Sequence, residues 1–161
     1  MGEPHVIMTL PGSVLTFQRC GYRFGLPVSV VEHVVARPSA SALPGAPSCV
    51  VGAINLHGEA VAVVDPAETF GRTDPLPRIE QRLIIALTPK RRLALVADKV
   101  EGVIDARAAR ATEATALAPG IERWQGLIGD AEGLIYVYDA EGLLNPAEEM
   151  ALAELLGQAA A

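Results

Sequence analysis

The stretch VGAINLHGEAVAVVD, residues 51–65, joins two runs of small and β-branched apolar residues through a short polar break. Such runs favour buried β-strand, and a break that contains Asn and Gly favours a tight turn. We therefore expect strand on both sides of a turn that Asn55 and Gly58 shape. His57 lies in the same break, so the first question is whether this histidine serves chemistry or only the turn.

The same pattern returns later in the chain, which indicates an internal repeat. Gly52 corresponds to Gly126 and Asp65 to Asp139, and both steps are 74 residues long. The apolar positions Ile54, Val61 and Val63 recur with the same offset as Ile128, Ile135 and Val137. Two copies of about five short strands each predict a mostly β fold of two small SH3-like barrels packed side by side, each closing its own edges.

Barrels of this size have little core of their own, so we expect them to pack into one cooperative unit with a groove at the seam. The prediction is a single domain over residues 13–145. One sub-barrel is expected at about 25–72 together with 133–145, and the other at about 80–130, by the positions of the repeat.

Two segments carry start signals for a helix. Asp65 and Asn145 can each cap a helix, and each is followed by Pro and then by Glu three positions after the cap. The first signal predicts a short helix that ends at Gly71, and the second predicts a C-terminal helix over 146–160. Residues 1–12 are expected to be a tail.

Composition and charge exclude several classes of protein. The net charge is −6 and aromatic residues make up 4% of the chain, which does not suit a nucleic-acid or anionic-membrane surface. The chain has no signal-peptide pattern and no apolar run long enough to span a membrane. Cys20 and Cys49 lack metal or disulfide spacing, and reduced cysteines predict a cytoplasmic location.

Candidate catalytic residues are sparse. His5, His33 and His57 have no metal-binding spacing, and capping explains the acids Asp65 and Asp139. No pair of titratable groups is placed for acid–base catalysis. We therefore predict a binding module that is not an enzyme and needs no cofactor or metal, with partner sites at exposed apolar positions on strands and at the seam.

Four segments in order resemble the CheW-like domain family, over about residues 14–156. VVGAINLHGEAVAVVDPAETFG resembles the central signature, and LALVADKVEGV resembles a second signature with an apolar strand before V-D-x-V. FGLPVSVVEHVV resembles an early strand with V-x-E-I, and LLNPAEEMAL resembles the start of the C-terminal helix.

The resemblance implies a fold of two intertwined five-stranded barrels and a role as an adaptor rather than an enzyme. Members of the family couple methyl-accepting chemoreceptors to the histidine kinase CheA. The expected partners are therefore the regulatory domain of a CheA-type kinase and the cytoplasmic hairpin tip of a chemoreceptor. The expected location is the cytoplasm, at receptor arrays on the inner face of the membrane, with no direct membrane insertion.

The resemblance also implies site residues. Val30 and Glu32 match the early V-x-E and are implied to face the kinase. The receptor groove is implied to include Val28 and the second-signature positions Ala94, Val96, Asp98 and Val100. The signature turn that shapes the seam is implied to comprise Gly52, Asn55, Leu56, His57 and Gly58.

Four positions depart from the family pattern. His57 stands where the family has Arg, and His33 where it has Ile, while Pro66 replaces Leu and Ala97 replaces Val. Arginine offers a permanently charged fork that histidine lacks. Three hypotheses follow: an adaptor that bridges both partners, a regulator that binds only one of them, and an enzyme or metal protein that uses His57 and nearby acids.

Overall fold

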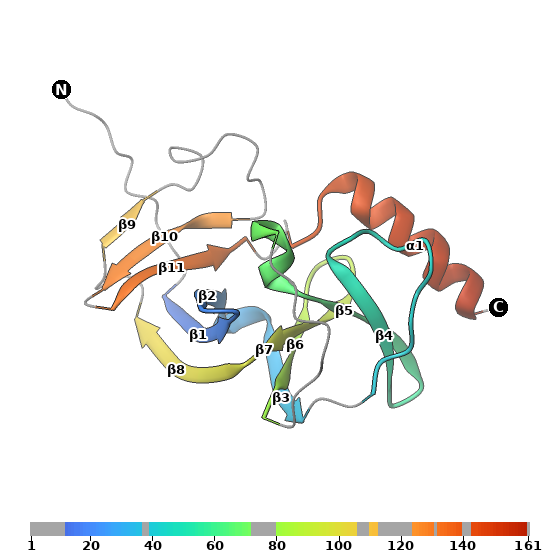
Figure 1. Cartoon of the computed structure of the whole chain (residues 1–161), viewed down its shortest axis with the longest axis horizontal. Coiled ribbons are helices and arrows are strands. Elements are labelled where there is room, and N and C mark those ends of the chain that lie inside the picture. Colours follow the sequence, from blue (N-terminus) through green and yellow to red (C-terminus); the bar gives the residue numbers. More distant parts are fainter. Residues whose placement is uncertain are drawn as a thin grey trace.

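The β-branched and alternating segments form two mixed β-sheets, and the chain ends in one α-helix (Figure 1). The computed structural model describes residues 12–36, 39–71, 80–105, 110–112, 124–130, 132–139 and 143–160. The mostly β fold with a C-terminal helix is confirmed, whereas closure of each sheet into a barrel stays a prediction.

The first sheet, called sheet A, has six strands in the order β8-β1-β2-β11-β10-β9. They are β1 (Ser13–Arg19), β2 (Tyr22–Pro27), β8 (Lys99–Asp105), β9 (Arg110–Thr112), β10 (Trp124–Asp130) and β11 (Gly133–Tyr138). Neighbouring strands are antiparallel except β2 and β11, which are parallel.

The second sheet, called sheet B, has five strands in the order β3-β6-β7-β5-β4. They are β3 (Val31–Ala36), β4 (Val50–Leu56), β5 (Glu59–Val64), β6 (Arg82–Leu87) and β7 (Arg92–Ala97). Here β5 and β7 form the parallel pair. The short 3-10 helix η1 (Val28–Val30) follows β2, η2 (Pro66–Phe70) follows β5, and α1 (Pro146–Ala160) ends the chain.

The repeat in the sequence is a repeat in the structure. Gly52 pairs with Val63 in the β4–β5 hairpin, and Gly126 pairs with Val137 in the β10–β11 hairpin. The register shifts just before the glycine in both hairpins. Each hairpin then joins its sheet through a parallel pair, β5 with β7 and β11 with β2. The 74-residue offset therefore marks two copies of one pairing pattern.

The two copies exchange their first hairpins, which the predicted sub-barrel division did not include. The first copy begins with β1 and β2, yet these strands lie in sheet A with β8, β10 and β11 of the second copy. The second copy begins with β6 and β7, which lie in sheet B with β3, β4 and β5 of the first copy. Strands β6 and β7 therefore lie with β3, β4 and β5, and strands β1 and β2 lie with β8, β9, β10 and β11. Both first hairpins carry similar apolar alternation, so the pattern alone does not reveal which sheet each one joins.

Strand β5 explains the continuous apolar run of the opening sequence. Val61 and Val63 point into a small cluster formed by sheet B alone. Ala62 and Val64, on the opposite face, join the largest cluster, which contains residues of both sheets and of α1. A strand segment covered on both faces needs apolar residues at successive positions, and β5 has them from Val61 to Val64.

The C-terminal helix begins as the sequence predicts. Asn145 Oδ1 accepts a hydrogen bond from the Glu148 amide at 2.8 Å, and Glu148 Oε1 accepts one from the Asn145 amide at 2.9 Å. This reciprocal pair is a capping box. Fully buried Leu152 fixes the helix to the largest core cluster, on the side of the molecule where β4 and β5 lie (Figure 1).

Candidate functional site

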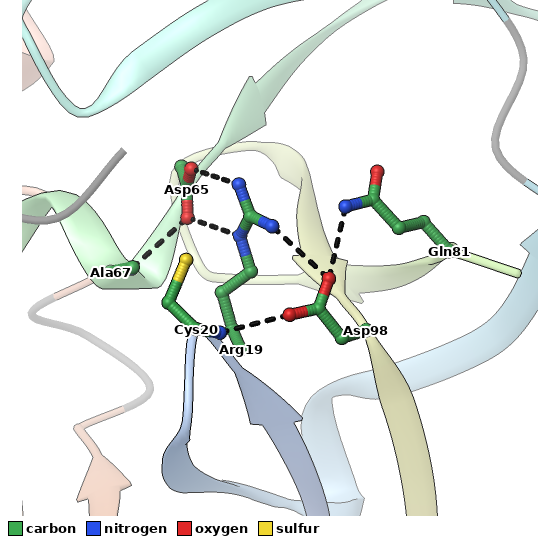
Figure 2. Close-up of polar contacts among 6 residues, drawn as sticks. All are labelled: Arg19, Cys20, Asp65, Ala67, Gln81 and Asp98. Carbon is green, nitrogen blue, oxygen red and sulfur yellow. Dashed lines mark hydrogen bonds and ion pairs between the residues drawn. The ribbon is translucent and has the colours of Figure 1, made fainter. Parts of the chain in front are cut away.

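A buried arginine joins the two sheets. Arg19 ends β1 in sheet A, and its side chain is 1% exposed. Its Nε lies 2.9 Å from Asp65 Oδ1 and its Nη2 lies 2.7 Å from Asp65 Oδ2, which is a bidentate ion pair (Figure 2). Asp65 follows β5 of sheet B and is itself 3% exposed. The hydrogen bond to Asp65 raises the pKa of the Arg19 guanidinium further above its ordinary value, although burial acts in the opposite direction.

Asp98 completes this network where the chain passes from β7 of sheet B to β8 of sheet A. Its Oδ1 lies 3.1 Å from Arg19 Nη1 and accepts from Gln81 Nε2 at 2.9 Å. Its Oδ2 accepts from the Cys20 amide at 2.9 Å. Burial works against ionisation of Asp98, but these hydrogen bonds and the charge of Arg19 outweigh it, so the pKa of Asp98 lies below its ordinary value.

Asp65 has the capping role that the sequence predicts and a second role that it does not. Its Oδ1 accepts from the Ala67 amide at 3.0 Å at the start of η2 (Figure 2). The same carboxylate neutralises Arg19, a residue 46 positions away. Every carboxylate oxygen of the Arg19 network is engaged in holding the sheets together. The network is therefore structural, and within the described residues no three His, Cys, Asp or Glu side chains gather to hold a metal ion.

The clearest exposed site is a depression of about 560 Å³ on sheet B, here called the Arg92 depression. The Arg92 guanidinium, on β7, lies between carboxylates of two other strands. Its Nε and Nη2 lie 2.5 and 3.0 Å from the oxygens of Glu32 on β3, and its Nη1 lies 2.6 Å from Glu59 on β5. The depression is lined by Glu32, His33, Leu56, His57, Glu59 and Arg92.

In the Arg92 depression, Arg92 favours the ionised form of Glu32. The hydrogen bonds from Arg92 hold the pKa of the Glu32 carboxyl below its usual value, and slight burial opposes this only in part. The two carboxylates share one guanidinium, which leaves a net charge of −1 from these three side chains. Such an exposed, oriented charge cluster suits recognition of a polar partner surface.

The signature turn carries His57 to the rim of this depression. His57 and Gly58 have φ of 53° and 88°, so both turn residues adopt the left-handed region that two-residue hairpins require. Asn55 Oδ1 accepts from the Gly58 amide at 2.7 Å. Leu56 ends β4, next to His57. Gly52 lies near the start of β4, where its Cα faces the backbone carbonyl of Ser41. His57 is thus an exposed turn residue at the rim of the Arg92 depression.

The residues assigned to the receptor groove differ in accessibility. Val28 is 38% exposed on η1, and Val100 on β8 is half-buried against the largest core cluster. Ala94 and Val96 have no exposed area, since both point into the cluster inside sheet B. These two positions can shape a groove from below but cannot contact a partner in this conformation. Val30, assigned to the kinase side, is half-buried beside Val28 on η1.

Strand β8 also borders a second depression, of about 430 Å³, on sheet A. Within it Glu101 lies 3.1 Å from Arg23 Nη2 and accepts from Gln18 Nε2 at 2.5 Å. Burial opposes ionisation of Glu101, but hydrogen bonds from Arg23 and Gln18 prevail and lower the pKa of its carboxyl. Val103, which also lines this depression, is 60% exposed.

The sequence did not point to Arg19 or Arg92. Arg19 stands in a strand in which apolar and polar residues alternate. Arg92 is the second of two consecutive arginines after a turn. The one available signal for Arg19 is a charged residue on the same face of its strand as Leu15 and Phe17, which predicts a buried partner. No comparable local signal marks Arg92.

Comparison with known proteins gives a consistent assignment. A family model described as a CheW-like domain matches residues 13–148. Among solved structures, the fold is similar to the crystal structure of the scaffolding protein TtCheW from Thermoanaerobacter tengcongensis, with a TM-score of 0.71 and 22% sequence identity. The match covers 86% of this chain and 96% of that chain. No curated protein matches the chain. Among the described helices, none has the length and apolar character needed to cross a membrane.

Proposed function

The chain belongs to the CheW-like domain family, and we propose that it couples chemoreceptors to a CheA-type histidine kinase by binding both at once. The family is non-catalytic, so this chain is a scaffold domain of chemotaxis signalling rather than an enzyme. The proposed partners are the regulatory domain of the kinase and the cytoplasmic hairpin tip of a methyl-accepting receptor. Both partners would be met in the cytoplasm, at receptor arrays.

The observation that carries this proposal is the family match together with the intertwined two-sheet fold. The match extends over 13–148, which includes both sheets and the start of α1. The fold has no cluster with catalytic geometry among its described residues, but it presents charged and apolar side chains on sheet surfaces. Such surfaces support binding without turnover.

The proposed kinase side lies around Glu32 on β3, and the proposed receptor side lies around Val28 and Val100. Val28 is the best residue with which to test the receptor side, because it is exposed and its replacement leaves the core intact. Val30 and Val100 pack against the core, so a charge at either position would disturb folding as well as binding.

Pull-down assays with the two proposed partners test the function. The wild-type chain should capture both a CheA-type regulatory domain and a receptor hairpin fragment. We expect Val28→Asp to weaken receptor capture by about tenfold or more, because an aspartate must lose water at an apolar contact. Val51→Asp is the matched control, since Val51 is similarly exposed and lies on β4, at the opposite end of the strand order of sheet B from β3, which follows η1.

The outcomes separate the proposed function from its alternatives. Failure of the wild-type chain to capture either partner would contradict the adaptor role. Equal loss in Val28→Asp and Val51→Asp would contradict the location of the receptor side. Capture of only one partner by the wild type would favour a regulator in place of a bridge, a candidate that the two histidines in the Arg92 depression support because both replace family residues.

A further inference from the structure

The signature turn and strand β7 line the same depression on sheet B. His57, in the turn, shares this depression with the guanidinium of Arg92, which starts β7. A permanent cation is therefore present beside the turn, and strand β7 supplies it.

The surroundings of Arg92 fit a residue that orients a recognition surface. Arg92 reaches Glu32 on one side of its strand and Glu59 on the other, so one guanidinium connects β3, β7 and β5. The three side chains are 28%, 29% and 49% exposed for Arg92, Glu32 and Glu59. Ion pairs this exposed contribute little to folding stability, which leaves the orientation of the carboxylates as their main effect. Because these charges are already oriented, less side-chain conformational entropy is lost when a partner binds.

We propose that Arg92 is a specificity-determining residue of the partner surface, where it positions Glu32 and Glu59. This inference rests on the proposed function, because it assigns a role within the kinase-facing surface around Glu32. Arg92 acts through the carboxylates that it holds, so it is a positioning residue. The same role could then be served from position 57, since His57 lines the same depression.

Moving the guanidinium from position 92 on β7 to position 57 in the signature turn tests the proposal. Arg92→Gln keeps a long polar side chain but removes the guanidinium, and we expect binding of a CheA-type regulatory domain to weaken by about tenfold or more. The double variant Arg92→Gln/His57→Arg returns a guanidinium to the depression and should recover binding to within about threefold of wild type. Arg82→Gln is the matched control, because Arg82 lies on β6 of the same sheet and outside the Arg92 depression.

A second measurement reports on the geometry without a partner. The pKa of the Glu32 carboxyl, followed by NMR, should rise toward its ordinary value in Arg92→Gln and fall again in the double variant. The thermal midpoint should be nearly unchanged in all three variants, since the ion pairs are exposed. A purely structural role of Arg92 would lower the midpoint and would not be rescued from position 57.

Two failures are distinguishable. If the wild-type chain does not bind the kinase domain, the proposed function is overturned and the binding role of Arg92 with it. If the wild type binds and Arg92→Gln binds equally well, or the double variant shows neither recovered binding nor a lowered Glu32 pKa, only the assignment of Arg92 is overturned.

Discussion

At the scale of single residues, Arg19 is the most deeply buried charged side chain among the described residues. A guanidinium that is 1% exposed requires a carboxylate with matching geometry, and Asp65 provides both oxygens. Removing one partner of such a pair leaves the other charge buried without compensation. The energetic consequence of a substitution therefore depends on whether Asp65 keeps its charge.

We expect Arg19→Met to lower the free energy of unfolding by about 3–5 kcal/mol, because Asp65 would remain buried as an unpaired anion. Urea unfolding followed by circular dichroism measures this change. The double variant Arg19→Met/Asp65→Asn should be less destabilised than Arg19→Met, since Asn still caps η2 and carries no charge. A double variant that is less stable than the single one would contradict this account.

The backbone conformation of the turn explains why a histidine is tolerated at position 57. His57 adopts a left-handed conformation at φ 53°, which histidine accepts more readily than β-branched residues do. Asn55 then closes the turn through the Gly58 amide. The local backbone therefore accommodates histidine at this position.

At the scale of elements, the C-terminal helix depends on its first turn. α1 is joined to the sheets by Leu152 in the core and by an ion pair between Glu149 and Arg91 at 2.6 Å. The capping box of Asn145 and Glu148 satisfies backbone donors that would otherwise lack partners. The cap therefore contributes to the stability of the helix together with these tertiary contacts.

Replacing the cap should therefore destabilise the protein. We expect Asn145→Ala to lower the free energy of unfolding by about 1 kcal/mol, through loss of the hydrogen bond to the Glu148 amide. Urea unfolding gives the value, and hydrogen exchange of the α1 amides should accelerate. Glu154→Ala, an exposed change in the middle of α1, is the control and should have an effect within about 0.5 kcal/mol.

At the scale of the whole molecule, acid should weaken the connection between the sheets and within sheet A. The pKa values of Asp98 and Glu101 are lower in the folded protein than their ordinary values. The folded state therefore binds fewer protons than the unfolded chain in the acid range. The stability from these groups is fully present above the unfolded pKa and is lost as the pH falls through the folded pKa.

We accordingly expect the free energy of unfolding to decrease as the pH is lowered from about 5 to 3. Urea unfolding at a series of pH values measures the slope. Asp98→Asn should be less stable than wild type at neutral pH and should show a shallower decrease, because it removes one of the titrating groups. An identical slope in both proteins would exclude Asp98 from the acid response.

Much of the fold could be predicted because its signals are local. The turn around Asn55 and Gly58 and the caps at Asp65 and Asn145 follow from residue type and short spacing. The 74-residue repeat follows from the recurrence of one local hairpin pattern. The candidate surface was predicted less completely. Glu32 and His57 were singled out separately, but their common depression and its guanidinium were not expected.

The amino-acid sequence by itself determined that this protein is mostly β, that its two halves repeat one hairpin pattern, and that a helix begins after Asp65 and another after Asn145. Each of these signals is carried by residues close together in the chain. Only the tertiary structure decided that the first hairpins exchange sheets, that Arg19 pairs with Asp65, and that Arg92 pairs with Glu32 from 60 residues away. Apolar alternation is the same for either sheet partner, and a charged side chain does not specify its counter-ion, so these choices depend on how the sheets pack.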